Sequence, residues 1–280
     1  MATIISGKEV AAKVRAEIKK DCEALDEMGI TPGLAVIIVG DDPASRVYVN
    51  NKKKACEEVG FVSEEYALPA ETTQEELLAL IHRLNGKPDI DGILCQLPLP
   101  KHLDEKAVIN AIDPTKDVDA FHPSNVGKIM IGDYDFLPCT PAGVMELIHS
   151  AGIEVSGKNC VVIGRSNIVG KPMAKLLLKE NMNVTVLHSK TSQEDMAFYI
   201  AHADVIVVAI GKAGFLDNRF TYKKDAVIVD VGISRTEEGL KGDAIPNLPV
   251  GLQTPVPGGV GLATRLALYE NLLEIYSANK

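Results

Sequence analysis

The chain has 280 residues, of which 46% are hydrophobic, enough for one large domain or two smaller domains with apolar cores. Its formal net charge of −9 argues against a nucleic-acid-binding protein, so an anionic ligand would need a local basic pocket. An apolar run of about 18 residues and a signal-peptide pattern are both missing, so we expect a soluble, cytoplasmic protein without a membrane segment. The five cysteines form no C-x-x-C pair and the six histidines show no metal-binding spacing, so the sequence predicts neither disulfides nor a metal site.

The spacing of apolar residues predicts the secondary structure in chain order. A helix over 10–28 comes first, because apolar residues recur there at steps of three and four. Up to residue 135 the pattern then predicts strand 34–39, helix 45–59, strand 62–68, helix 74–84, strand 92–95, helix 105–112 and an irregular stretch. A helix is expected to open at Thr140-Pro141, with Thr140 as the N-cap and Pro141 at the first helical position. The remaining elements are strand 160–163, helix 168–178, strands 184–187, 205–210 and 226–231, and a final helix 264–276.

Strands that alternate with helices are typical of parallel sheets covered on both faces. Two such series occur in this chain, and the stretch 113–139 separates them. We therefore expect an α/β protein of two domains with a cleft between them.

The stretch from Cys160 to Pro172, CVVIGRSNIVGKP, predicts a phosphate-binding turn. An apolar strand meets a small-residue turn and then a helix, which directs backbone N–H groups and the positive helix end toward one point. The spacing of Gly164, Ser166 and Gly170 departs from G-x-G-x-x-G, so this stretch alone also fits an ordinary strand–turn–helix connection.

The end of the next strand lacks the carboxylate that usually binds the ribose 2′-hydroxyl of NAD. Here Leu187 is followed by His188-Ser189-Lys190. Together with Arg165, these side chains would attract a 2′-phosphate, so we predict NADP rather than NAD, although the segment also fits a solvated loop. Two glycines at later strand ends, Gly211 and Gly232, could let the backbone approach a nucleotide or could simply form turns.

The catalytic candidate lies on the predicted helix 45–59. Tyr48 and Lys52 are spaced i and i+4, so they share a helix face. Gln96 comes just after a strand, where ligands collect in open α/β sheets. A lysine desolvated in such a cleft can act as a general acid or base. The alternative is that the run Lys52–Lys54 is a solvated charged surface.

Asp117-Val118-Asp119 places two carboxylates in one predicted loop. A metal site would need more ligands nearby, and none is evident. One of the aspartates could accept hydrogen bonds from a donor-rich heterocycle, or both could serve turn and cap chemistry.

Several long motifs occur in one order along the chain and carry a family resemblance. They are Tyr48-Val49-x-x-Lys52-x-Lys54-Ala55-Cys56, residues 92–100 (GILCQLPLP), 116–119 (KDVD), 138–141 (PCTP), 164–172 (GRSNIVGKP), 229–233 (VDVGI) and 254–261 (TPVPGGVG). Over nearly its full length the chain resembles the bifunctional methylenetetrahydrofolate dehydrogenase/methenyltetrahydrofolate cyclohydrolase family. It departs from the family pattern at Ala120, where glycine is usual, and at Leu262-Ala263, where Pro-Met is usual.

The resemblance implies two reactions in one cleft. Hydride passes from 5,10-methylenetetrahydrofolate to NADP⁺, and water then opens the methenyl product to 10-formyltetrahydrofolate, as part of one-carbon metabolism and purine biosynthesis. The implied roles are acid/base chemistry for Lys52, hydrogen bonding to that lysine for Gln96, orientation of the folate for Tyr48, and anchoring of the pterin-like ring for Asp119. The implied cofactor contacts are Gly164, Arg165, Ser166, Ser189 and Ile233.

The resemblance also implies an organisation of the chain. A folate domain of residues 1–139, completed by the C-terminal helix 264–280, would accompany a Rossmann-like NADP domain of residues 140–263 through which two copies form a homodimer. The alternatives are a member with only one activity, another two-domain NADP-linked dehydrogenase such as a shikimate-type enzyme, and a nucleotide-sensing module without turnover.

Overall fold

The computed structural model describes residues 2–278 and, for Ala44 and Tyr48, the backbone alone. The chain divides into two units. The three-stranded unit consists of residues 14–137 and 268–278, and the six-stranded unit consists of residues 2–13 and 138–267. The predicted folate and NADP domains differ from these units at their boundaries and remain a prediction about function.

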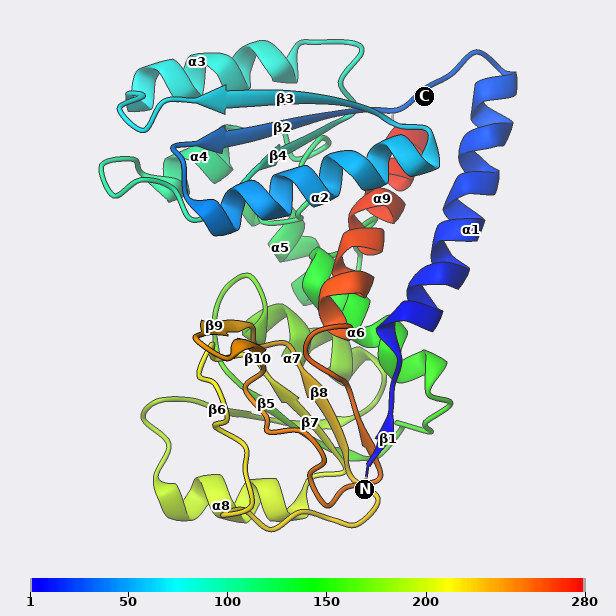
Figure 1. Cartoon of the computed structure of the whole chain (residues 1–280). Helices are drawn as coiled ribbons and strands as arrows, with labels where there is room; N and C mark the ends of the chain where they lie inside the picture. Colours follow the sequence, from blue (N-terminus) through cyan, green and yellow to red (C-terminus); the bar gives the residue numbers. More distant parts are fainter. Residues whose placement is uncertain (1, 279–280) are drawn as a thin grey trace. The chain divides into compact units, whose positions relative to one another are not determined.

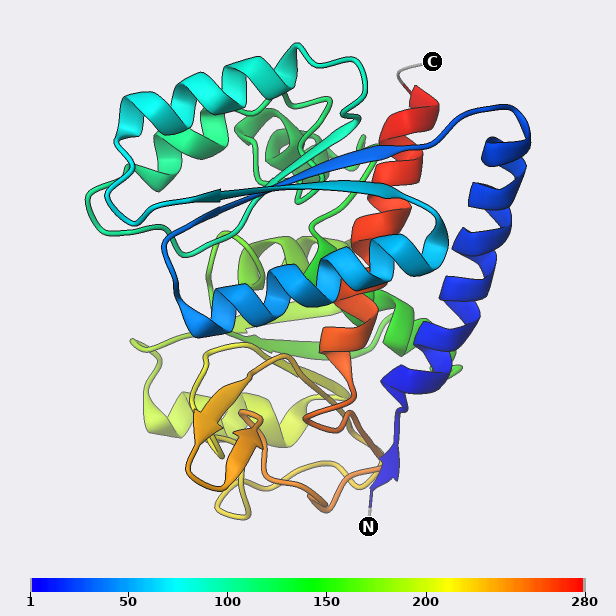
Figure 2. The same ribbon diagram turned by 45° about the horizontal axis from the view of Figure 1, so that its top comes forward.

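The three-stranded unit is built on a parallel sheet in the order β3-β2-β4. Its strands are β2 (Gly33–Val39), β3 (Val62–Leu68) and β4 (Gly92–Cys95). Every residue of β2 is buried, because this central strand is covered on both faces. Helices α3 (Gln74–Asn85) and α4 (Glu105–Ala111) cover one face, and α2 (Pro43–Val59) covers the other (Figures 1 and 2). Because all three strands are parallel, their carboxyl ends lie at the same edge of the sheet.

Local sequence explains where α2 begins, and hence where Lys52 lies. The Asp42 side chain accepts a hydrogen bond from the Ser45 N–H at 2.7 Å, and Pro43 occupies the first helical turn. An acceptor at the N-cap and a proline just inside the helix are both favourable start signals. The predicted helix 45–59 is thus confirmed, with a start two residues earlier.

The prediction of an irregular stretch up to residue 135 is wrong, because α5 (Pro123–Ile131) lies within it. The ring Nδ1 of His122 accepts the Ser124 N–H at 3.1 Å and so caps the helix, and Gly132 ends it with a left-handed φ of 83°. The signal is weak because the helix is short and leaves its apolar residues Met130 and Ile131 exposed.

The prediction of Thr140 as an N-cap is also wrong. Helix α6 (Cys139–Ser150) starts two residues earlier, with Pro138 at the cap position and without a side-chain cap bond. Thr140 and Pro141 lie in its first turn, where proline is tolerated because the backbone N–H there has no partner within the helix.

The six-stranded unit contains a parallel sheet in the order β1-β11-β8-β7-β5-β6. Its strands are β1 (Thr3–Ile4), β5 (Asn159–Ile163), β6 (Asn183–Leu187), β7 (Val205–Val208), β8 (Val227–Asp230) and β11 (Leu252–Gln253). Helix α8 (Gln193–His202) covers one face, while α6 and α7 (Gly170–Lys179) cover the other (Figures 1 and 2). The strand order reverses at β5, the kind of switch point at which open α/β sheets bind ligands.

Three further elements complete the structure. A hairpin of β9 (Ser234–Thr236) and β10 (Gly239–Lys241) follows β8. Helix α1 (Gly7–Glu27) and helix α9 (Val260–Ala278) each contain a boundary between the two units. The three-stranded and six-stranded sheets are parallel, which confirms the predicted α/β class. Within residues 2–278 no helix has the length and hydropathy of a membrane span.

Candidate active site

Two predicted catalytic residues meet at the carboxyl edge of the three-stranded sheet. The Lys52 Nζ on α2 donates a hydrogen bond to the Gln96 Oε1 at 3.3 Å. Gln96 directly follows β4, and its backbone N–H donates to the Ile37 carbonyl at 2.8 Å. Its side-chain Nε2 donates to the Leu97 carbonyl at 2.8 Å, which leaves the amide oxygen facing the lysine. The glutamine is therefore held at both its main chain and its side chain.

The lysine run is not uniformly solvated. Lys52 is half-buried, whereas Lys53 and Lys54 are exposed, as expected when consecutive residues fan around a helix that is packed on one side. Tyr48 lies one helical turn before Lys52, and its side chain is outside the described residues. The structure thus distinguishes one lysine from its two neighbours.

The two aspartates of the loop at 117–119 have different surroundings. Asp117 is buried, and its Oδ2 accepts hydrogen bonds from the His122 N–H at 2.7 Å and the Asn125 Nδ2 at 3.0 Å. Burial raises the pKa of the Asp117 carboxyl to about 6 despite these hydrogen bonds. Asp117 therefore serves the fold, and half-buried Asp119 is the aspartate left as a ligand candidate.

The residue after Asp119 is one of the departures from the family pattern, and its backbone conformation is unusual for alanine. Ala120 adopts a left-handed backbone with a φ of 54°, and its side chain is fully buried. Glycine reaches this conformation without a steric cost, whereas a residue with a Cβ pays about 1–2 kcal/mol. The backbone after Asp119 thus takes a shape that favours glycine, although alanine occupies the position.

The predicted phosphate turn has the close packing of a dinucleotide-binding loop. A Cβ on Gly164 would lie 2.5 Å from the Ala209 carbonyl oxygen, and a Cβ on Gly170 would lie 2.4 Å from the Gly164 carbonyl oxygen. The Ser166 Oγ accepts hydrogen bonds from the N–H groups of Val169 at 3.1 Å and Gly170 at 3.3 Å. Ser166 therefore stabilises the start of α7 at a position where the usual motif has glycine.

The turns after β5 and β6 lie at neighbouring strand ends, because Ile163 and Leu187 are paired in register. Arg165 follows the first strand and Ser189 the second, and both are exposed. The His188 N–H donates to the Thr191 Oγ1 at 3.0 Å, and its ring Nδ1 accepts the Lys190 N–H at 3.2 Å. His188 thus shapes the turn that presents Ser189.

Sequence reasoning missed two buried carboxylates beside the remaining strand ends. Asp243 is fully buried and accepts hydrogen bonds from the N–H groups of Ile210 (2.7 Å), Gly211 (3.0 Å) and Lys212 (2.6 Å), in the turn after β7. Asp230, the last residue of β8, accepts from the N–H groups of Gly232, Asp243 and Ala244.

Burial, followed by repulsion from Asp243, raises the pKa of the Asp230 carboxyl to about 6, against the effect of its hydrogen bonds. The sequence signal for Asp230 was an acidic residue at the end of an apolar strand. The exposed Ile233 follows this anchored segment directly.

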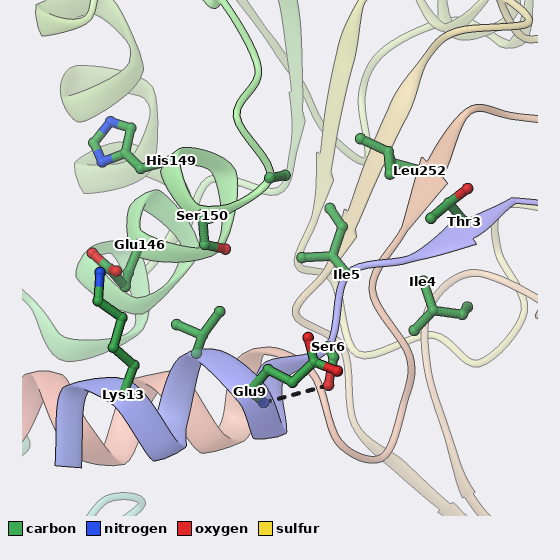
Figure 3. Close-up of a pocket in the computed structure, with 12 residues that line it drawn as sticks. Thr3, Ile4, Ile5, Ser6, Glu9, Lys13, Glu146, His149, Ser150 and Leu252 are labelled. Atoms are coloured by element: carbon green, nitrogen blue, oxygen red, sulfur yellow. Dashed lines mark hydrogen bonds between the residues drawn. The ribbon is translucent and has the colours of Figure 1, made fainter. Parts of the chain in front are cut away.

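A separate hollow of about 610 Å³ lies along β1, the start of α1 and the end of α6 (Figure 3). None of the predicted cofactor residues lines it. Its ionisable lining side chains, which are Glu9, Lys13, Glu146 and His149, are exposed or half-buried. Within residues 2–278 no three His, Cys, Asp or Glu side chains form a metal-binding group.

Comparison with known proteins identifies the whole chain. Residues 5–119 match the model of the tetrahydrofolate dehydrogenase/cyclohydrolase catalytic domain, and residues 138–280 match the model of the NAD(P)-binding domain of the same family. The bifunctional protein FolD of Acetivibrio thermocellus is 57% identical over 277 residues, which cover 98% of this chain and 96% of the relative.

Solved structures agree with this result. The bifunctional FolD from Campylobacter jejuni is 44% identical with a TM-score of 0.95, and the match covers 100% of both chains. The Trypanosoma brucei FolD, solved in complex with NADP cofactor and an inhibitor, is 36% identical with a TM-score of 0.94 over 99% of this chain and 98% of that chain. The shikimate dehydrogenase of Aquifex aeolicus, at 17% identity and a TM-score of 0.51, shares the fold alone. The chain therefore belongs to the tetrahydrofolate dehydrogenase/cyclohydrolase family.

Proposed function

We propose that this protein oxidises 5,10-methylenetetrahydrofolate to 5,10-methenyltetrahydrofolate with NADP⁺ and hydrolyses the methenyl form to 10-formyltetrahydrofolate. The observation that carries the proposal is the hydrogen bond between Lys52 and Gln96 at a strand carboxyl edge, in a chain that contains both domains of the family. A sensing module would need no such pair. An enzyme with the dehydrogenase activity alone would have no use for an acid/base lysine held by a glutamine.

In the hydrolysis, water adds to the methenyl carbon, and the bond from that carbon to N5 of the folate then breaks. One proton leaves the water as it adds, and a second leaves the resulting hydroxyl as the formyl carbonyl forms. N5 takes up one proton, so the reaction releases one proton overall. We assign these transfers to the Lys52 Nζ, which lies next to an acceptor that orients it. Gln96 can accept from this nitrogen in both protonation states of the amine, so the lysine stays in place through the cycle.

Two other residues orient the substrate in this proposal. Asp119 accepts hydrogen bonds from the donor-rich pterin ring, and its negative charge stabilises the positive charge of the methenyl intermediate. Tyr48, on the same helix as Lys52, orients the folate. The three-stranded unit would thus hold the folate, because Lys52, Gln96 and Asp119 all belong to it.

The six-stranded unit fits a dinucleotide. The turn at Gly164 has no room for a Cβ at Gly164 or Gly170, and the strand end after Leu187 carries Ser189 in place of a carboxylate. Arg165 and Ser189 would hold the 2′-phosphate of NADP, while Gly164, Ser166 and Ile233 would contact the rest of the cofactor. When bound, NADP⁺ supplies the acceptor for the hydride, and this chain's residues supply alignment.

The test is to mix the protein with methylenetetrahydrofolate and NADP⁺ or NAD⁺ and to follow methenyl absorbance as it forms and decays. We expect a higher kcat/KM with NADP⁺. Lys52→Met should abolish the decay, whereas Lys53→Met, at the exposed neighbouring position, should leave it unchanged. A preference for NAD⁺ refutes the cofactor assignment, and formyl product made by Lys52→Met at near the wild-type rate refutes the role of the lysine.

We also propose that the protein is a cytoplasmic homodimer joined through the six-stranded unit. Strand β6 has a neighbour on one side only, β5, and exposed apolar side chains gather on β6 and its two flanking helices. They are Leu178, Val186, Phe198 and Tyr199. A second copy covering this edge would remove apolar surface from water and pair an open strand edge.

Sedimentation of the wild type and of Val186→Lys tests the dimer. The proposal requires a dimeric wild type. It also requires that the Val186→Lys dimer dissociates at a higher protein concentration than the wild-type dimer. A monomeric wild type contradicts it.

A further inference from the structure

Two buried polar side chains of helix α9 form hydrogen bonds with the segments that contain Lys52 and Asp119. The Tyr269 hydroxyl donates a hydrogen bond to the main-chain carbonyl of Lys52 at 2.9 Å. The Asn271 Nδ2 donates to the Val118 carbonyl at 2.9 Å. We propose that Tyr269 and Asn271 are positioning residues, the first for Lys52 and the second for Asp119. The inference rests on the proposed function, which gives Lys52 and Asp119 their chemical roles.

The bond from Tyr269 is additional to the helix's own hydrogen bonding. Within an α-helix the Lys52 carbonyl is also the acceptor for the N–H four residues later, so the backbone does not need the tyrosine to satisfy it. Tyr269 is fully buried and packs against the Phe61 ring edge-to-face, with ring centroids 5.8 Å apart. A fixed ring thus ties α9 to the α2 turn from which the Lys52 side chain reaches Gln96.

The same phenol also contacts Cys56, one turn after Lys52. Burial raises the pKa of the Cys56 thiol to about 12, while hydrogen bonds with Tyr269 and Ser63 act in the opposite direction. The thiol is therefore neutral at physiological pH and behaves as a packing group. Tyr269 thus contacts two successive turns on one face of α2.

Asn271 makes a second bridge, to the loop at 117–119. Besides the Val118 carbonyl, its Nδ2 donates to the Leu137 carbonyl at 2.6 Å, and its Oδ1 accepts the Leu137 N–H at 3.3 Å. The Val118 side chain is itself fully buried. Both the main chain and the side chain of Val118 are therefore fixed, and this sets the backbone from which Asp119 extends.

A merely structural role would lower stability without changing kcat and KM selectively, so the test measures the two constants separately. Tyr269→Phe removes one oxygen and should lower the kcat of the cyclohydrolase about three- to tenfold, the effect of losing the hydrogen bond to the Lys52 carbonyl, with the folate KM within about twofold of wild type. The matched control is Tyr222→Phe, in which a buried hydroxyl that donates to the Asp217 carbonyl at 2.8 Å is lost elsewhere. This control should lower the Tm comparably and leave the cyclohydrolase kcat unchanged.

Asn271→Ala should change the folate KM rather than the cyclohydrolase kcat. We expect the folate KM of both reactions to rise about three- to tenfold, with the cyclohydrolase kcat within about twofold of wild type. The control is Asn85→Ala, because Asn85 makes the same kind of bridge, donating to the Ala111 carbonyl at 2.8 Å and accepting the Asp113 N–H at 3.0 Å. If Asn271→Ala does not fold, the folate KM and the cyclohydrolase kcat are measured in Asn271→Ser, which is a milder change because serine keeps one hydrogen-bond donor.

The outcomes are distinct. If Tyr269→Phe and Tyr222→Phe change kcat equally, or if Asn271→Ala raises the folate KM no more than Asn85→Ala, the positioning roles are overturned. If Lys52→Met retains cyclohydrolase activity, the proposed function itself fails, whatever the α9 variants show. Cyclohydrolase activity lost in Lys52→Met and lowered about three- to tenfold in kcat in Tyr269→Phe, with an unchanged kcat in Tyr222→Phe, supports both.

Discussion

The buried carboxylate of Asp243 organises the turn after β7, so replacing it with asparagine tests how that turn serves the cofactor. In the wild type, Oδ2 accepts the N–H groups of Ile210 and Gly211, and Oδ1 accepts that of Lys212. Asparagine keeps one oxygen, which can serve the first two donors. Its amide group then faces the Lys212 N–H, and two donors oppose each other.

The magnitude follows from these three bonds. Hydrogen bonds to a charged group contribute about 1.5–3 kcal/mol each, against about 1 kcal/mol for neutral pairs. Asp243→Asn removes one charged bond and makes two others neutral, so the free energy of unfolding should fall by at least about 3 kcal/mol. For a unit of this size the Tm should fall by at least about 6 °C.

Asp243→Asn should weaken the binding of NADP⁺ and leave the binding of the folate unchanged. The turn after β7 lies beside the turn after β5, because Ile163 and Val208 are paired in register. If the shifted turn costs the dinucleotide about 1 kcal/mol of binding, the KM for NADP⁺ should rise about fivefold. The KM for the folate should not change, because Lys52 and Gln96 belong to the other unit.

Steady-state kinetics and thermal unfolding of two variants check this prediction. The control is Asp204→Asn, because Asp204 accepts the Asn159 N–H at 2.8 Å and pairs with Lys223 at the amino ends of the strands of the same sheet. It should cost stability without raising the KM for NADP⁺. Equal KM values for Asp243→Asn and Asp204→Asn would refute the reasoning.

Three further predictions concern the fold around both sites. Gly92→Ala should destabilise the protein by about 1–3 kcal/mol in denaturant titration, because a Cβ there would lie 2.3 Å from a Val118 methyl, and a cost below this range would contradict the packing. Burial raises the pKa of Asp117 to about 6, so its contribution to stability is present at low pH and is lost as the pH rises through about 6. Asp117→Asn should therefore flatten the fall in unfolding free energy between about pH 4 and pH 6, and an equally steep fall would refute the sign. Ser166→Ala should lower the Tm and weaken NADP⁺ binding, since two N–H groups at the start of α7 lose their acceptor, and calorimetry with NADP⁺ measures both.

The sequence predicts most of the three-stranded unit because its signals are local. Strands 62–68 and 92–95 have the predicted bounds, since turn residues or a proline segment follow each one. The pairing of Lys52 with Gln96 also follows from local reasoning, which places one residue on a helix face and the other at a strand end. Helix α5 escaped because its cap is the ring nitrogen of His122, an acceptor outside the usual Ser, Thr, Asp and Asn set.

The contacts that escaped prediction join distant parts of the chain. Tyr269 and Lys52 are 217 positions apart, and Asn271 lies 153 positions from Val118. No periodicity or motif spacing reports such a pair. Asp243 also lies far from its partners, 31 to 33 positions away, and its burial becomes evident only when the turns after β7 and β8 are seen together.

The boundaries inside α1 and α9 bear on the order in which the protein is completed during synthesis. Apart from β1, the strands of the three-stranded unit are made before those of the six-stranded unit, yet Tyr269, Asn271 and Leu272 come only after the whole of the six-stranded unit. Until then Gly92 and Val118 lack the Leu272 side chain that packs beside them. The unit whose sheet is made first is therefore the last to acquire all its contacts, and cutting the chain between Leu137 and Pro138 would leave neither piece with a complete unit.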